Sequence, residues 1–168
     1  MMNRIFLLAL AALLNTALAY GQAGGPSAPS RPYVVRTKQQ VTDAFRAMEK
    51  QDGNKNVDIF PAVGAQTRVA VFHDEKREND SFEVHELADD IYYVLEGTAT
   101  LMLGGTLVGP DEISPGEWRS KHADGGERVS IGKGDLIVVP RGTPHQRTVT
   151  GKSFSMILIK VFAEPAKQ

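Results

Sequence analysis

The spacing of apolar residues changes along the chain from a helical to a strand-like pattern. Apolar residues recur at the three- and four-residue spacing of one helix face at Val41, Ala44, Phe45 and Met48. Thr37 and Gln40, three residues apart, match a capping box, which predicts the start of this helix. Gly53 predicts that the helix ends before this residue. We therefore predict one short amphipathic helix, packed on the outside of a sheet.

From Val57 onward, short segments rich in β-branched and aromatic residues alternate with turn residues. We predict about eight strands, at residues 67–72, 81–85, 91–95, 99–103, 128–131, 136–139, 145–150 and 153–162. Glu96–Gly97 is predicted to form a tight turn between two of them. The charged segment 74–81 is predicted to be a solvated loop, and the glycine-rich segment 104–126 an irregular excursion. So many short strands with so little helix predict an all-β sandwich or barrel.

The first 36 residues follow a third pattern. Arg4 precedes an uncharged apolar run at residues 5–14, and the small residues Ala17 and Ala19 close the run. This pattern is typical of a secretory signal peptide and is too short for a comfortable membrane span; a buried helix or an uncleaved anchor is the alternative. We predict cleavage after Ala19, a periplasmic or secreted protein without a membrane anchor, a flexible linker at 20–36 and a folded domain at 37–168.

Composition narrows the chemistry that the domain can perform. The 168 residues include no cysteine, which excludes a disulfide, a thiolate metal site and a cysteine nucleophile. Lys and Arg number 19 against 20 for Asp and Glu, so the chain offers no electrostatic footprint for nucleic acid. The residues left to carry chemistry are chiefly the four histidines and the carboxylates around them.

Two histidines lie in suggestive contexts. Glu83 and His85 are two residues apart on a predicted strand, so their side chains leave the same face. Asp90 opens the next strand after a short turn and can face back across the pair, whereas Asp89 should point to the opposite face. His145 follows a Pro-Arg-Gly-Thr-Pro turn and begins a returning strand.

These residues fall in two motifs that resemble those of the cupins. The second cupin motif, G-x5-P-x4-H-x3-N, is matched at Gly134, Pro140 and His145, with Val149 in place of the final Asn. The agreement of the glycine, proline and histidine spacings makes the resemblance specific for the fold.

The first cupin motif, G-x5-H-x-H-x3-4-E-x6-G, is matched at His85 and Gly97. Glu83 stands where the first His would be, and Asp90 stands where the Glu would be. Arg77, inside the charged loop, stands where the opening Gly would be. The departures therefore fall mainly on ligand positions.

The resemblance implies a double-stranded β-helix, the jelly-roll barrel of the cupins, with one divalent metal inside it. It implies Mn, Fe, Ni or Zn, held by His85, His145 and Asp90, with Glu83 as a further ligand. Positions left open on the metal would bind a small-molecule substrate, and oxygenase, lyase and isomerase activities all occur on this fold. Glu83 or an unligated Asp90 would then serve as general base. The resemblance also allows a homodimer.

Other readings of the same residues stay open. The alternative is a barrel that binds a small ligand without metal or serves as a structural module, as in cupins that have lost their metal. Tyr92 is either a substrate hydrogen-bond donor or a core tyrosine, and Arg147 either meets an anionic substrate or is an exposed strand residue. His73 is predicted to lie at the rim of the barrel.

Overall fold

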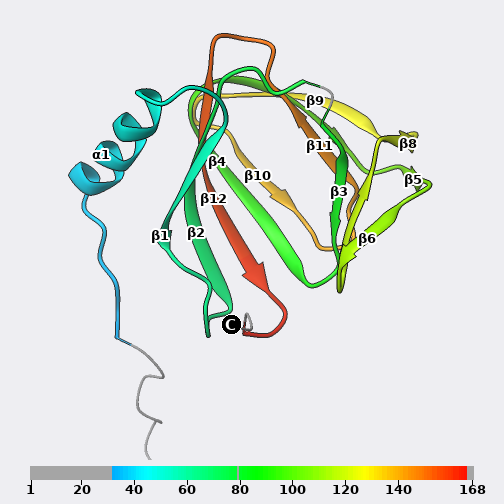
Figure 1. Ribbon diagram of the computed structural model, residues 1–168, viewed down its shortest axis with the longest axis horizontal. Coiled ribbons are helices and arrows are strands. Elements are labelled where there is room, and N and C mark those ends of the chain that lie inside the picture. The colour runs from blue at the N-terminus through cyan, green and yellow to red at the C-terminus, as the bar shows by residue number, and fades with distance from the viewer. Residues whose placement is uncertain (1–31, 79, 166–168) are drawn as a thin grey trace, which may run out of the picture. The chain divides into compact units, whose positions relative to one another are not determined.

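The computed structural model describes residues 32–78 and 80–165 (Figure 1). The predicted signal peptide and most of the predicted linker lie outside the described residues. Val34–Gln168 forms one compact unit, which is described by itself. Within the described ranges, no helix is both long and apolar enough to cross a membrane. The elements are α1 (Lys38–Glu49), β1 (Lys55–Phe60), β2 (Thr67–Asp74), β3 (Phe82–His85), β4 (Ala88–Leu103), β5 (Thr106–Val108), β6 (Asp111–Ser114), β7 (Glu117–Ser120), β8 (His122–Asp124), β9 (Glu127–Gly132), β10 (Leu136–Val139), β11 (His145–Thr148) and β12 (Phe154–Phe162).

The strands form two antiparallel sheets that share the long strand β4. Sheet 1 contains β1, β2, β12, the first half of β4 and β10, and sheet 2 contains β9, the second half of β4, β11, β3, β7 and β6. A separate two-stranded sheet joins β5 to β8. Figure 1 shows sheets 1 and 2 facing each other. The predicted all-β, jelly-roll class is confirmed, with one short helix before the first strand.

The helix α1 has the predicted capping box and the predicted position. The Thr37 hydroxyl accepts a hydrogen bond from the Gln40 backbone N–H, and the Gln40 side chain accepts one from the Thr37 backbone N–H. The helix packs on the outer face of sheet 1, where the Phe45 ring lies 5.9 Å from that of His73. His73 is buried there and hydrogen-bonded to Ser155, so its predicted place at the rim was wrong.

The predicted tight turn at Glu96–Gly97 was also wrong, because β4 runs through it as one strand of 16 residues. The register with β12 shifts between Ser155 and Met156, because β4 has a β-bulge at Leu95, which has no partner on β12. Gly97 follows with φ of +78°. The bulge and the glycine bend β4, so that its first half belongs to sheet 1 and its second half to sheet 2.

Two segments predicted to be irregular or solvated contribute ordered structure instead. The glycine-rich segment 104–126 forms β5, β6, β7 and β8. In the charged segment 74–81, Asp74 is the buried last residue of β2, and Arg77 forms a β-bridge with Val149. Charge alone did not reveal that these two side chains are turned inward.

The inward-facing side chains change from apolar to polar along each central strand. On β12 the sequence Phe154, Met156, Leu158 is buried and apolar, and Lys160 follows two residues later. On β4 the buried Val94 and Tyr92 lead to Asp90 in the same way. The hydrophobic core thus fills one part of the space between the sheets and leaves a polar part beside it.

Candidate metal centre

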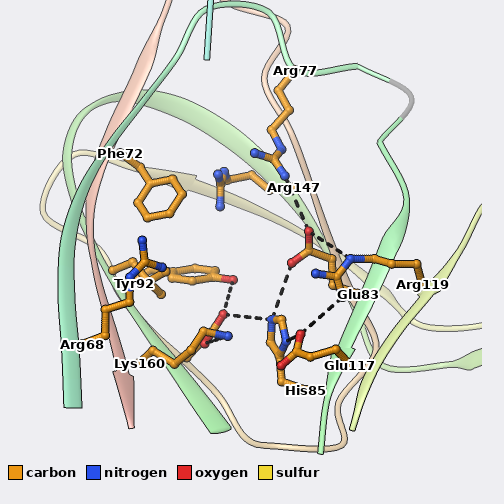
Figure 2. Close-up of a pocket in the computed structure, with 12 residues that line it drawn as sticks. Arg68, Phe72, Arg77, Glu83, His85, Tyr92, Glu117, Arg119, Arg147 and Lys160 are labelled. Atoms are coloured by element: carbon orange, nitrogen blue, oxygen red, sulfur yellow. Dashed lines mark hydrogen bonds and ion pairs between the residues drawn. The ribbon is translucent and has the colours of Figure 1, made fainter. Parts of the chain in front are cut away.

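Six strands, three from each sheet, direct alternate residues into the polar part of the barrel. A side chain two positions along a strand returns to the same face, so each strand contributes a pair. The pairs from sheet 1 are Arg68 and Phe72, Asp90 and Tyr92, and Leu158 and Lys160, and those from sheet 2 are Glu83 and His85, Glu117 and Arg119, and His145 and Arg147. All of these except His145 line, together with Arg77, a cavity of about 310 Å³ (Figure 2).

Strand register brings the charged partners together. Glu83 is directly opposite His145 on one side and Arg119 on the other, and His85 is directly opposite Glu117. In sheet 1, Asp90 is directly opposite Lys160, and their side chains form an ion pair with Asp90 Oδ1 2.9 Å from Lys160 Nζ. Cross-strand neighbours of this kind lie close enough to interact.

His85 is held by a carboxylate on each side of its ring. Its Nδ1–H donates to Glu117 Oε2 at 2.5 Å. Its Nε2 lies 3.5 Å from Glu83 Oε2 and 3.5 Å from Asp90 Oδ2. Glu117 therefore orients the ring so that Nε2 points toward two further carboxylates, as Figure 2 shows for Glu83. A carboxylate that orients an imidazole from behind is typical of metal-ligating histidines.

His145 leaves one ring nitrogen without a partner. Its Nδ1–H donates to the Thr143 carbonyl at 2.9 Å, because a carbonyl oxygen can only accept. In the neutral ring this leaves a lone pair on Nε2. That atom is buried, has no hydrogen-bond partner among the described residues, and lies 3.9 Å from Asp90 Oδ2. A buried lone pair that faces a carboxylate is unfavourable, and a cation bound between the two would satisfy both.

The residues present fit a divalent metal ion. One ligand atom from each of Glu83, His85 and His145 lies within 4.8 Å of the other two, and the rings of His85 and His145 are 5.2 Å apart. Two imidazoles and one carboxylate suit Mn, Fe, Ni or Zn and leave positions open for other ligands. Asp90 lies against both histidines, but one of its oxygens is occupied by Lys160.

The two carboxylates that face Nε2 of His85, Glu83 and Asp90, remain ionised at neutral pH. Burial by itself raises the pKa of Glu83, but the contacts with His85 and Arg119 outweigh burial and lower this pKa to about 2. Burial likewise acts to raise the pKa of Asp90, whereas His85 and Lys160 lower it to about 2. Carboxylates with so low a pKa are well suited to bind a cation and poorly matched to serve as a base at neutral pH.

The two histidines respond to these surroundings in opposite directions. For His85, burial lowers the pKa, but contacts with Asp90, Glu117 and Glu83 outweigh it and raise the pKa to about 10. For His145, burial dominates and lowers the pKa, so this ring is neutral. Without a metal, the cation of the cluster is therefore the proton on His85, which leaves Nε2 of His145 unsatisfied.

The other two predicted site residues lie in the same cavity. Tyr92 is buried and its hydroxyl donates to Asp90 Oδ2 at 3.4 Å, so this hydroxyl positions the carboxylate. Burial raises the pKa of Tyr92 strongly. Arg147 is only 8% exposed and pairs with Asp74, so the exposed alternative for this residue was wrong.

Five charged groups of the cavity were not predicted from the sequence. Glu117 and Arg119 lie in the segment predicted to be irregular, and Arg77 lies in the one predicted to be solvated. Lys160 belongs to a predicted strand, where the spacing of two from Leu158 could have placed it on the inward face. Arg68 also lies in a predicted strand. Glu117 and Arg119 carry no such signal, because the pairing of β3 with β7 determines their place, and the place of Arg77 depends on its bridge with Val149.

No protein-family model matches the chain, and no curated protein matches it in sequence. Solved structures that resemble it include those of the DMSP lyases RdDddP and RnDddQII, at a TM-score of 0.48 and 15% identity over 66% of this chain and 48% of that chain. The structure of KdgF from Halomonas sp. resembles it at a TM-score of 0.48 and 17% identity, over 70% of this chain and 84% of that chain. The structure of Pac13, a nucleoside dehydratase from Streptomyces, resembles it at a TM-score of 0.46 and 21% identity, over 69% of this chain and 72% of that chain. The chain spans about half the length of the lyase chain, and likenesses at this level carry no inference about activity.

Proposed function

We propose that this chain is a cupin-type metalloprotein that binds one divalent transition-metal ion through Glu83, His85 and His145 and acts there on a small molecule. The observation that carries the proposal is Nε2 of His145, a buried lone pair without a donor that faces carboxylates. Glu83 and His85 converge on the same point from the neighbouring strand. A metal ion would satisfy all three groups at once.

Asp90 has a different place in this proposal from the three ligands. It contacts both imidazoles but is also paired with Lys160 and hydrogen-bonded by Tyr92. Its low pKa argues against general-base catalysis at neutral pH. We assign Asp90 to the metal centre as a further carboxylate, whose charge Lys160 balances and whose orientation Tyr92 supports.

A bound metal would supply Lewis-acid polarisation of a substrate oxygen at its open positions. The residues of this chain would hold the centre in a fixed geometry: Glu117 orients His85, and Thr143 orients His145. The cavity of about 310 Å³ sets the size of the substrate at that of a small metabolite. The predicted signal peptide leads us to propose that this occurs outside the cytoplasm.

One observation favours a second function, which is a cup that binds a small ligand without metal. The proton on His85 balances part of the charge of Glu83, Asp90 and Glu117, since these contacts raise the pKa of His85 to about 10. The charge around His85 is thus partly balanced without a metal ion. A metal-free cup does not account for His145, because the proton on His85 gives Nε2 of His145 no hydrogen-bond partner.

Metal binding by the purified protein tests the proposal. We expect isothermal titration of the metal-free protein with Mn, Fe, Ni and Zn salts to show one site for at least one of these ions. His145→Ala should weaken that binding at least about tenfold, since it removes one of three ligands. The matched control is His122→Ala, which removes an exposed histidine of β8 outside the cavity and should leave affinity unchanged.

Loss of the metal should also lower thermal stability, because a ligand bound only by the folded state stabilises it. We expect EDTA to lower the melting temperature of the wild type and of His122→Ala, but not that of His145→Ala. A wild type that binds none of the four ions would overturn the metal proposal in favour of the metal-free cup.

A further inference from the structure

Basic side chains outnumber carboxylates in the wall of the metal-centre cavity. Three carboxylates line it, and three more pair with its arginines from behind, Asp58 with Arg68, Asp74 with Arg147 and Asp80 with Arg77. The five basic residues that line it are Arg68, Arg77, Arg119, Arg147 and Lys160. Among the residues that line the wall itself, the basic groups outnumber the carboxylates five to three. Guanidinium N–H groups that face the cavity without a partner attract an anionic ligand.

Arg147 is anchored in a way that leaves part of its guanidinium free. Both Nε and Nη2 donate to the same oxygen of Asp74, at 3.0 Å and 2.8 Å. No hydrogen bond links its Nη1 to another residue in the described part of the chain. Arg147 follows His145 by two residues on β11, so both side chains face the same interior. The ion pair fixes the guanidinium, and Nη1 is available to a ligand.

Arg68 presents a second guanidinium at the same aromatic ring. Its guanidinium carbon lies 5.9 Å from the centroid of Phe72, and that of Arg147 lies 5.8 Å from the same centroid. Arg68 uses Nε and Nη2 on Asp58 and Asn56, which again leaves Nη1 without a partner among the described residues. Figure 2 shows both guanidiniums turned toward the space that Glu83 and His85 also face.

We propose that Arg68 and Arg147 form an anion-binding subsite and that the small molecule taken by this cavity is an organic acid, whose carboxylate they bind. The inference rests on the proposed function in assigning the ligand of the same cavity. Guanidiniums donate to carboxylates in strong, charge-assisted hydrogen bonds. Because both guanidiniums are already held against Phe72, their side chains lose little conformational entropy when the acid binds. The opposite end of the acid then faces Glu83 and His85.

Titration with matched acids and amides tests this assignment. Acetate, lactate, succinate and benzoate are each compared with the corresponding neutral amide, in metal-free and in metal-loaded protein, and inorganic phosphate is included. We expect at least one acid to bind the metal-free protein at least about tenfold more tightly than its amide, because the amide lacks the charge. The metal-free arm separates this inference from the metal proposal, since the arginines are present in both forms.

Variants of the two arginines locate the binding. Arg68→Gln should weaken binding of the preferred acid about tenfold and leave binding of its amide unchanged. Arg46→Gln removes an exposed arginine of α1 as the matched control and should change neither. Because Arg147→Gln would leave Asp74 buried without its partner, the double variant Asp74→Asn with Arg147→Gln removes both charges together.

Three results would overturn the inference. One is that no acid binds more tightly than its amide in either form of the protein. Another is that phosphate binds more tightly than every carboxylate, which would assign the subsite to a phosphate group. The third is that Arg68→Gln and the double variant bind the preferred acid as well as the wild type does. Acid binding without metal binding would sustain this inference and contradict the metal proposal.

Discussion

Nε2 of His85 lies between two carboxylates at equal distances, and the cation placed there determines the behaviour of the centre. In the metal-free protein that cation is a proton, held because burial, which lowers the pKa of His85, is outweighed by its carboxylate contacts. A metal ion that binds Nε2 must displace this proton. The two states of the centre therefore differ in one imidazole proton, and this difference leads to a test by pH.

The stability of the metal-free protein should depend on pH in both directions. Since the pKa of Glu83 is lowered from 4.5 to about 2, this group stabilises the fold above pH 4.5 and loses that contribution as pH falls through 2. Since the pKa of His85 is raised from 6.5 to about 10, its contribution is complete below pH 6.5 and is lost as pH rises through 10. The lowered pKa of His145 acts against stability below pH 6.5, because the unfolded ring binds a proton there and the folded ring does not. Urea unfolding of EDTA-treated protein should therefore show the highest free energy of unfolding near pH 6.5.

A free energy of unfolding that rises steadily from pH 6.5 to pH 10 in the metal-free protein would show that His85 is not charged in the folded state. His85→Gln provides the control, because it removes the titrating group and should flatten the alkaline limb only. Glu83 still titrates in that variant, although without its contact to the imidazole.

Lys160 is expected to be the most costly single charge to remove from the centre. Its Nζ lies 2.9 Å from Asp90 Oδ1, and both side chains are nearly buried. Lys160→Met leaves the carboxylate without its cation and should lower the free energy of unfolding by about 3 kcal/mol. Lys133→Met, at an exposed turn position, should change it by less than about 0.5 kcal/mol. Equal effects in the two variants, measured by urea unfolding, would show that the ion pair contributes nothing.

At the scale of elements, the bend in β4 is what allows two sheets to meet around one site. The bend requires Gly97, because a Cβ atom at this position would lie 2.2 Å from the Ser153 carbonyl oxygen and φ is +78°. A strand without the bend would continue in sheet 1 and would not carry its second half to β9 and β11. The fold of the barrel therefore depends on this glycine more than on its neighbours.

Gly97→Ala should lower the free energy of unfolding by about 3 kcal/mol, from the strained φ and the contact with the Ser153 carbonyl together. Gly53→Ala is a matched control, because Gly53 has φ of +79° but nothing within 4 Å of the added Cβ atom. The control should cost about 1 kcal/mol, the strain alone. Thermal unfolding that gives the same loss for both would show that the close approach at Gly97 is relieved easily.

The helix and most strands could be predicted because their signals are local. Thr37 and Gln40 cap α1 as predicted, and alternation along 136–139 and 153–162 matches β10 and β12 within one residue. The turn predicted at Glu96–Gly97 failed because a glycine at positive φ serves a hairpin and a bent strand equally well. Asp74 shows the other limit, since its burial depends on Arg147, which is 73 residues away.

At the scale of the molecule, the candidate site is assembled from both sheets. Asp90 and Tyr92 come from sheet 1 and His85 from sheet 2, and the sequence placed these on inward faces through their spacing. It gave no indication of Glu117, which orients His85, because the register of β3 with β7 is a long-range property. Ligand candidates could thus be chosen from the sequence, while the groups that orient them could not.

The most direct test of the account is a crystal structure of the protein loaded with the ion that binds most tightly, with anomalous scattering recorded at that metal's absorption edge. We predict one strong anomalous peak within coordination distance of the Glu83 carboxylate, Nε2 of His85 and Nε2 of His145, with the Thr143 carbonyl still accepting a hydrogen bond from His145. A metal-loaded crystal whose peaks lie only on surface carboxylates, with Nε2 of His145 still unpartnered, would contradict it.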